Sequence, residues 1–154
     1  MADQPPLIFE RQFGKLIPVN AAAQQAMLAL GEGKRTVVKL SGMTRNQRRR
    51  GFYWTLLDVV SDVLTDRTKT PWDSQTLHDE LRHRLKLYVP LETPSGRKVP
   101  KLKSTSDKSM NEVERAAWTN RVVNYLEHMT GIEAHVLIDE VKSHGFEPEL
   151  KEVA

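Results

Sequence analysis

The chain has 154 residues, of which 39% are hydrophobic and 28% are charged, and its formal net charge is +3. This length and composition predict a soluble globular protein with a single domain over residues 1–146, and they exclude a largely disordered chain. The sequence contains no cysteine. Disulfides, thiolate metal sites and cysteine nucleophiles are therefore excluded, and a reducing compartment is favoured.

The two ends of the sequence bear on its location. Residues 1–6 have neither the basic nor the apolar region of a secretory signal, and no later stretch approaches the roughly 18 apolar residues of a membrane span. We therefore expect a cytoplasmic protein with no membrane association. Residues 147–154 contain three glutamates and one lysine, which predicts a flexible acidic tail.

The N-terminal segments 7–13 and 16–19 are rich in apolar residues and lie on either side of Gly14-Lys15. This pattern predicts a β-hairpin with its turn at Gly14-Lys15.

An alanine-rich helix is predicted over residues 21–30, because Asn20 can cap its first turn and Gly31 can end it. Residues 36–40, Thr-Val-Val-Lys-Leu, are rich in β-branched side chains and are predicted to form a third strand. This strand would lead into a basic loop before the next helix.

Two core helices are predicted in the middle of the chain. The first covers about residues 46–64 and has one apolar stripe, made of Phe52, Leu56, Val59, Val60 and Val63. The second begins near Pro71 and repeats Leu77, Leu81 and Leu85 on one face. We expect the two helices to pack against each other.

Residues 87–91 and 97–105 are predicted to form a second, basic hairpin around the turn Thr93-Pro94-Ser95-Gly96. Pro90 and Pro100 place these strands at a sheet edge or on a protrusion. Such a hairpin can embrace nucleic acid, or its lysines can simply guard an edge against aggregation.

A long helix is predicted from a cap at Ser109 or Asn111 to about Met129, and a last helix from about Glu133 to His144. The apolar side of the long helix is predicted to include Val113, Ala116, Ala117, Val122, Val123, Leu126 and Met129, and that of the last helix Val136, Leu137 and Val141. The fold class is therefore α+β, with a small antiparallel sheet containing both hairpins packed on four to five helices.

The strongest functional signal is a basic segment that ends at the aromatic start of a helix. It contains no acid and seven cations, which are Lys34, Arg35, Lys39, Arg45, Arg48, Arg49 and Arg50. Cations at a helix N-terminus cost about 0.3–1 kcal/mol each, so folding alone does not explain them. A polyanion would explain them, although a solvated charge run is the plain alternative.

Further residues extend this candidate nucleic-acid interface. Asn46 lies within the basic run, and Trp54 is expected on an exposed turn where its ring could stack on a base. The basic hairpin adds Arg97, Lys98, Lys101 and Lys103. Together these positions predict a surface that follows phosphates.

A metal-dependent nuclease is an alternative interpretation. Asp58 and Asp62 lie one turn apart, and Asp79 and Glu80 follow on the next helix, so that four carboxylates could surround Mg²⁺. Acids spaced four apart are more often a solvated face, and the five histidines show no ligand spacing. We predict no catalytic residue, metal site or cofactor, and we expect His78 and His83 at the surface.

Several short motifs occur in a recognisable order. They are Gly14-Lys15-Leu16-Ile17-Pro18, a valine-rich strand, Arg45-Asn46 before Phe52-Tyr53-Trp54-Thr55-Leu56-Leu57, Leu85-Lys86-Leu87-Tyr88, and Pro100-x-x-x-Ser104-Thr105-Ser106 ahead of a long helix near Met110. Over about residues 7–144 this order resembles the NinB/Orf group of phage recombination proteins. The resemblance implies a homodimer that binds single-stranded DNA in a bacterial host, cooperates with the host single-strand-binding protein, and helps to load a recombinase, without catalysis.

Carried over by residue, the basic positions of the group correspond to Arg48, Arg49 and Arg50, and the polar run corresponds to residues 103–106. Gly51 departs from the pattern, because a further basic residue is expected there. The sequence also allows a protein adaptor, in which the basic surface binds the acidic tail of a single-strand-binding protein.

Overall fold

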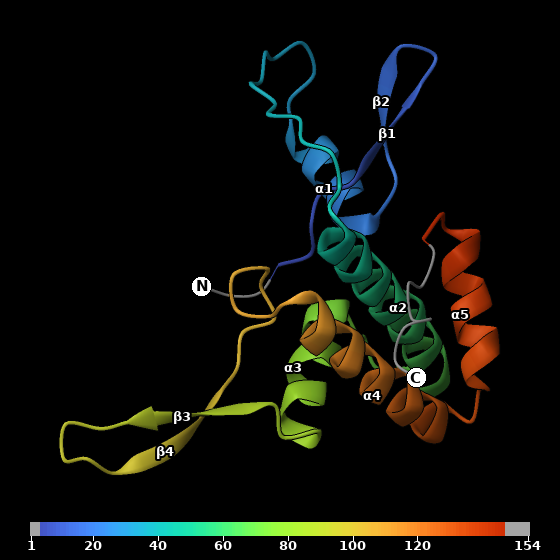
Figure 1. The fold of residues 1–154 in the computed structure, drawn as a ribbon. Helices are drawn as coiled ribbons and strands as arrows, with labels where there is room; N and C mark the ends of the chain where they lie inside the picture. Colours follow the sequence, from blue (N-terminus) through green and yellow to red (C-terminus); the bar gives the residue numbers. More distant parts are fainter. Residues whose placement is uncertain (1–3, 147–154) are drawn as a thin grey trace.

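A computed structural model describes residues 4–146. The predicted tail, residues 147–154, lies outside the described residues. The α+β class is confirmed, since helices and antiparallel hairpins follow one another along the chain (Figure 1). The elements are β1 (Phe9–Gln12), β2 (Lys15–Pro18), α1 (Ala21–Ala29), α2 (Arg45–Thr68), α3 (Ser74–Arg84), β3 (Tyr88–Glu92), β4 (Lys98–Leu102), α4 (Glu112–Thr130) and α5 (Ala134–Ser143).

Helix α2 is the centre of a helical body, and α3, α4 and α5 all pack on it (Figure 1). Of its predicted stripe, Phe52, Leu56 and Val60 are fully buried, whereas Val59 and Val63 are half-buried. Burying one such side chain contributes about 1.5–3 kcal/mol to folding. The predicted contact with α3 is confirmed, because Leu77 and Leu81 are also fully buried in this core.

Both ends of α2 are defined by capping. The Thr44 side chain accepts a hydrogen bond from the Gln47 N–H, and the Gln47 side chain accepts one from the Thr44 N–H, which forms a capping box. The helix ends at Lys69, which adopts a left-handed conformation with φ of 56°. The helix therefore begins at Arg45, six residues before Gly51 and one residue before the predicted start.

Gly51 allows a close approach to α2. A Cβ atom at this position would lie 2.8 Å from the Ile8 side chain and 2.8 Å from the Phe146 ring. The segment that precedes β1 and the turn that follows α5 therefore meet on this glycine. A basic side chain, as expected from the resemblance, would displace both of them.

The N-terminal hairpin is confirmed, but its turn lies one residue earlier than predicted. Phe13 and Gly14 both have positive φ, at 50° and 78°, so they form the two central positions of the turn. This geometry matches the twist of a tight antiparallel hairpin. The cap of α1 is also as predicted, since the Asn20 side chain accepts a hydrogen bond from the Ala23 N–H.

The second hairpin is confirmed as a protruding arm. Strands β3 and β4 pair antiparallel, with Pro90 opposite Pro100 and Glu92 opposite Lys98, and Figure 1 shows them extending away from the helices. The prediction of one sheet containing both hairpins is wrong, because each hairpin forms a separate two-stranded sheet. The prolines remove backbone donors that a further strand would need.

The predicted strand over residues 36–40 is also wrong for the single chain. These residues are extended but pair with no strand in the described chain, and Val37 is 98% exposed. Strand propensity reflects packing against neighbours, and the described part of the chain places no strand beside this segment.

The apolar sides of the last two helices are partly as predicted. Trp118, Val122 and Leu126 of α4 and Leu137 and Val141 of α5 are buried. Val113, Ala117 and Met129 of α4 and Val136 of α5 are exposed, so their predicted burial is wrong. The side chain of Asn111, and not that of Ser109, caps α4 and forms a capping box with Glu114.

One buried arginine joins three parts of the chain. The Arg115 side chain of α4 is 1% exposed, and its guanidinium donates to Asn46 Oδ1 at 2.6 Å, to the Thr105 carbonyl at 2.8 Å and to Asp107 Oδ1 at 3.1 Å. The Asn46 amide in turn donates to the Met110 carbonyl at 3.1 Å. The N-terminus of α2, the loop that follows β4 and the start of α4 are thereby held together.

Replacing Arg115 should destabilise the fold strongly. We expect Arg115→Ala to lower the free energy of unfolding by about 3 kcal/mol or more, because buried acceptors lose their donor. Urea unfolding followed by circular dichroism measures this change. Arg84→Ala, which removes an exposed pair with Glu80, is the control and should lower the stability far less, because solvent screens an exposed ion pair. If both variants lowered the free energy of unfolding equally, the stabilising role assigned to the Arg115 hydrogen bonds would be contradicted.

Candidate nucleic-acid interface

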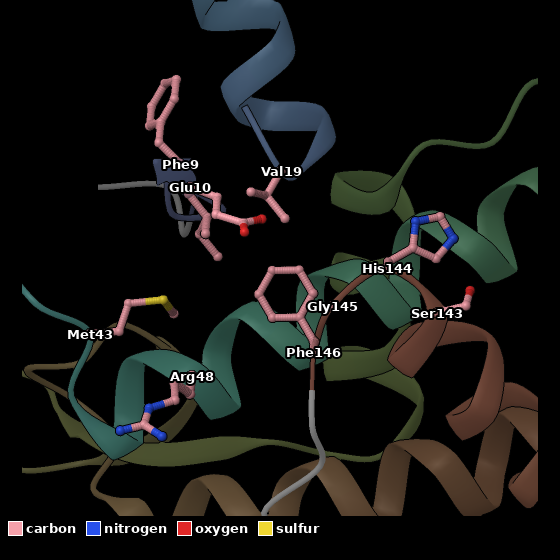
Figure 2. A pocket seen from close by; sticks show the side chains of 10 residues that line it. Phe9, Glu10, Val19, Met43, Arg48, Ser143, His144, Gly145 and Phe146 are labelled. Carbon is pink, nitrogen blue, oxygen red and sulfur yellow. The ribbon is translucent and has the colours of Figure 1, made fainter. Parts of the chain in front are cut away.

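The cations predicted at the start of α2 fall into two groups. Arg45 and Arg48 are exposed. Arg48 also borders a cleft of about 610 Å³ that is lined by Glu10, Met43 and His144. Figure 2 shows the Arg48 guanidinium at one side of this cleft and His144 at the opposite side, with the Phe146 ring between them.

Arg49 and Arg50 are directed toward the protein instead. Arg49 is 6% exposed and donates from Nη1 to the Glu112 carbonyl at 2.9 Å. Arg50 donates to the Gln4 carbonyl and lies 3.6 Å from Asp107 Oδ2. Asn46 belongs to the Arg115 network. These three side chains therefore hold the helix start in place, whereas the sequence predicted that all of them would contact DNA.

The exposed position predicted for Trp54 is wrong. Its side chain is 1% exposed, and its ring lies edge-on to Tyr53 at 5.7 Å and 4.8 Å from the His78 ring. The surface position predicted for His78 is also wrong, because this side chain is fully buried and its Nδ1 is hydrogen-bonded to the Tyr53 hydroxyl at 2.7 Å. His83 is exposed, as predicted.

This burial has a simple cause in the packing of α2. Residues 51–57 are all buried, because α2 is covered on every side at this level. A stripe pattern assumes one buried face and one wet face, so it places Trp54 outside.

The remaining predicted cations lie on two projections from the helical body. Lys34, Arg35 and Lys39 are exposed in the segment between α1 and α2. Arg97, Lys98 and Lys101 are exposed at the tip and along the second strand of the β3–β4 hairpin. Among residues 4–146, no ion pair involves any of these six side chains.

Lys103 differs from the other hairpin cations. Its Nζ lies 3.0 Å from Glu114 Oε1, and this contact joins the base of the hairpin to the first turn of α4. The pKa of Glu114 is lowered, first by the hydrogen bond from the Asn111 backbone N–H and then by Lys103. Lys103 is therefore already paired with a carboxylate that stays ionised.

The two projections extend in different directions in Figure 1, with the segment before α2 and the β3–β4 hairpin diverging from the helical body. A single chain therefore presents two separate basic surfaces and not one continuous patch. This separation was not expected from the sequence, which predicted that both hairpins share one sheet.

The four carboxylates considered for a nuclease fall into two pairs with different surroundings. Asp79 and Glu80 are paired with Arg82 and Arg84, each at 2.6 Å. Within residues 4–146, no three side chains among the histidines, aspartates and glutamates gather in a way that could hold a metal ion. Asp58 and Asp62 line a cleft of about 620 Å³ together with Glu140 and His144, which no sequence motif indicated.

Asp58 has a perturbed environment. Burial raises the pKa of its carboxyl above the usual 3.8, a hydrogen bond with Ser74 opposes this shift, and the negative charge of Asp62 adds to it. A carboxyl group with a raised pKa destabilises the fold when it is ionised.

In the described part of the chain, no helix is long and apolar enough to cross a membrane.

Comparison with protein-family models, with curated proteins and with solved structures found no match.

The raised pKa of Asp58 predicts that this residue makes the stability of the fold depend on pH. Because folding raises this pKa, the ionised side chain costs stability above the unfolded pKa, and protonation removes the cost. We expect Asp58→Asn to raise the melting temperature at about pH 7, and the gain should vanish at about pH 3, where Asp58 is protonated in both states. Melting curves at both values measure this difference. Asp62→Asn, one turn away and exposed, should change stability less; an equal gain would contradict the assignment to burial.

Proposed function

We propose that the protein binds single-stranded DNA without catalysing a reaction, and that it acts as a mediator of phage recombination. The observation that supports this proposal is the set of six exposed cations on the two projections, which have no ion pair among the described residues. The buried or half-buried cations, in contrast, are bonded within the fold, as Arg115 and Lys103 show.

This division favours an external anion as the binding partner. Exposed lysines and arginines that form no ion pair with the described residues contribute little to folding, yet their charges are available to neutralise phosphates and release counterions. Two projecting segments can follow a flexible strand more readily than a rigid duplex, because a single strand bends to reach both.

Trp54 is buried, so a base would have to stack on a different aromatic ring. Tyr88 lies on β3, is 41% exposed, and stands on the same hairpin as Lys98 and Lys101. We infer that Tyr88 supplies the stacking surface that the sequence assigned to Trp54, with a contribution of about 1–3 kcal/mol per stacked base.

The recombination role rests on the ordered motifs that resemble the NinB/Orf group. The same resemblance suggests a homodimer and a partnership with a single-strand-binding protein and a recombinase. A dimer would present two copies of each projection, and this doubling would strengthen binding through effective concentration.

Fluorescence anisotropy with labelled single-stranded and duplex DNA across a salt series tests the proposal. We expect the double change Lys98→Ala and Lys101→Ala, and separately the triple change at Lys34, Arg35 and Lys39, to weaken binding. For single strands, the slope of log affinity against log salt should fall by about 0.7 for each lost phosphate contact. Tyr88→Leu should lower the affinity with little change in this slope.

The matched control removes two cations that are exposed but already paired, Arg84 and Lys142, and it should leave binding nearly unchanged. Arg49 and Arg50 are left intact in every variant, because their loss would disturb the fold. Absence of binding to either DNA near physiological salt would reject the proposal and favour a protein adaptor. Cleavage that requires Mg²⁺ would favour the nuclease.

A further inference from the structure

Exposed apolar side chains are concentrated in the N-terminal quarter of the chain. Eleven of the sixteen exposed large apolar residues in the described chain lie between residues 7 and 43; they are Leu7, Phe13, Leu16, Ile17, Met27, Leu28, Leu30, Val37, Val38, Leu40 and Met43. Figure 1 shows that β1, β2, α1 and the following segment stand together at the N-terminal end of α2. A concentration of exposed apolar side chains in one region is typical of an interaction site, so a partner is expected to cover it.

The segment Thr36–Leu40 lies at the edge of this surface. It is extended, and no backbone hydrogen bond joins it to another part of the described chain. A groove of about 630 Å³ separates it from the start of β1 and from α1, with Leu7, Met27, Leu30 and Val38 among its lining residues. An extended segment with β-branched residues and unpaired backbone groups is a template for strand pairing.

We propose that Thr36–Leu40 pairs antiparallel with the same segment of a second copy of this chain. Pairing all five residues with themselves places the two-fold axis at Val38. Thr36 then stands opposite Leu40, and Val37 stands opposite Lys39, so no two like charges face each other. A two-fold contact of this kind is self-complementary and forms a closed dimer.

A second copy also accounts for the extent of the surface. Two five-residue strands bury little area by themselves, whereas a stable interface takes about 800 Å² from each partner. Apolar side chains of α1 and of the first hairpin line the groove beside the segment, and in the proposed dimer they would supply the additional area in both copies.

The pairing would bring basic residues together. Lys34 and Arg35 precede the segment, and Arg45 and Arg48 follow it at the start of α2. Antiparallel strands set the beginning of one segment beside the end of the other, so cations of both copies would share one surface. This inference rests on the homodimer included in the proposed function, but it does not depend on DNA binding.

Cysteine cross-linking tests the pairing, because the chain has no native cysteine. Residues directly opposite in an antiparallel pair have Cα atoms about 4.5–5.5 Å apart, which fits a disulfide. We expect Val38→Cys to form mostly disulfide-linked dimer under mild oxidation, read on a non-reducing gel.

Val37→Cys is the matched control, one residue away and more exposed, at 98% against 58%. In the proposed register its two copies are roughly 8 Å apart, too far for an unstrained disulfide, so its yield should be several-fold lower. If disulfides formed only by random collisions between chains, the more exposed Val37→Cys would give the higher dimer yield. Val113→Cys, 74% exposed on α4, should give the least dimer.

Analytical ultracentrifugation provides an independent measurement on chains without cysteine. We expect the unmodified protein to be a dimer and Val38→Glu to be a monomer with an unchanged circular dichroism spectrum. A dimer that persists in Val38→Glu, or equal cross-linking at both valines, would overturn this interface while leaving a dimer intact. A monomer at every concentration would overturn the interface and the homodimer together, and the anisotropy measurement would still decide DNA binding separately.

Discussion

The burial of the Arg115 guanidinium is the constraint on which the other features depend. A charged group that is 1% exposed requires several acceptors. They are Asn46 at the start of α2, and Thr105 and Asp107 in the loop after β4. These contacts fix the base of the β3–β4 hairpin relative to the N-terminus of α2. Both basic projections therefore leave the helical body at defined positions, although each projection itself has few contacts with that body.

The surroundings of each cation, and not its residue type, decide whether it is bonded within the fold or exposed to solvent. Arg49 and Arg50 are adjacent to Arg48 in the sequence, yet they bond to backbone carbonyls and to Asp107, whereas Arg48 is exposed beside a cleft. A buried cation stabilises the fold only through such partners. The six exposed cations of the two projections have no ion pair among the described residues. Their charges remain available for an external anion, and this difference is the physical basis of the proposed DNA binding.

The apolar surface between residues 7 and 43 connects the proposed function with assembly. Helix α1 and the first hairpin have little core of their own, and the valines of the following segment lie in solvent. Covering these side chains with a second copy would stabilise the N-terminal region by the hydrophobic effect. It would also extend a basic surface that a single chain provides only in separate parts.

The sequence by itself determined the helices, both hairpins and the α+β class, because capping residues, turn residues and apolar spacing act over a few neighbours. Asn20 capped its helix as predicted, and Pro90 and Pro100 marked a protruding arm. Only the tertiary structure decided that Trp54 and His78 are buried, that Arg49 is directed toward the protein, and that residues 36–40 have no strand partner among residues 4–146. Burial and pairing depend on what surrounds an element from distant parts of the chain, and local sequence patterns carry no information about those neighbours.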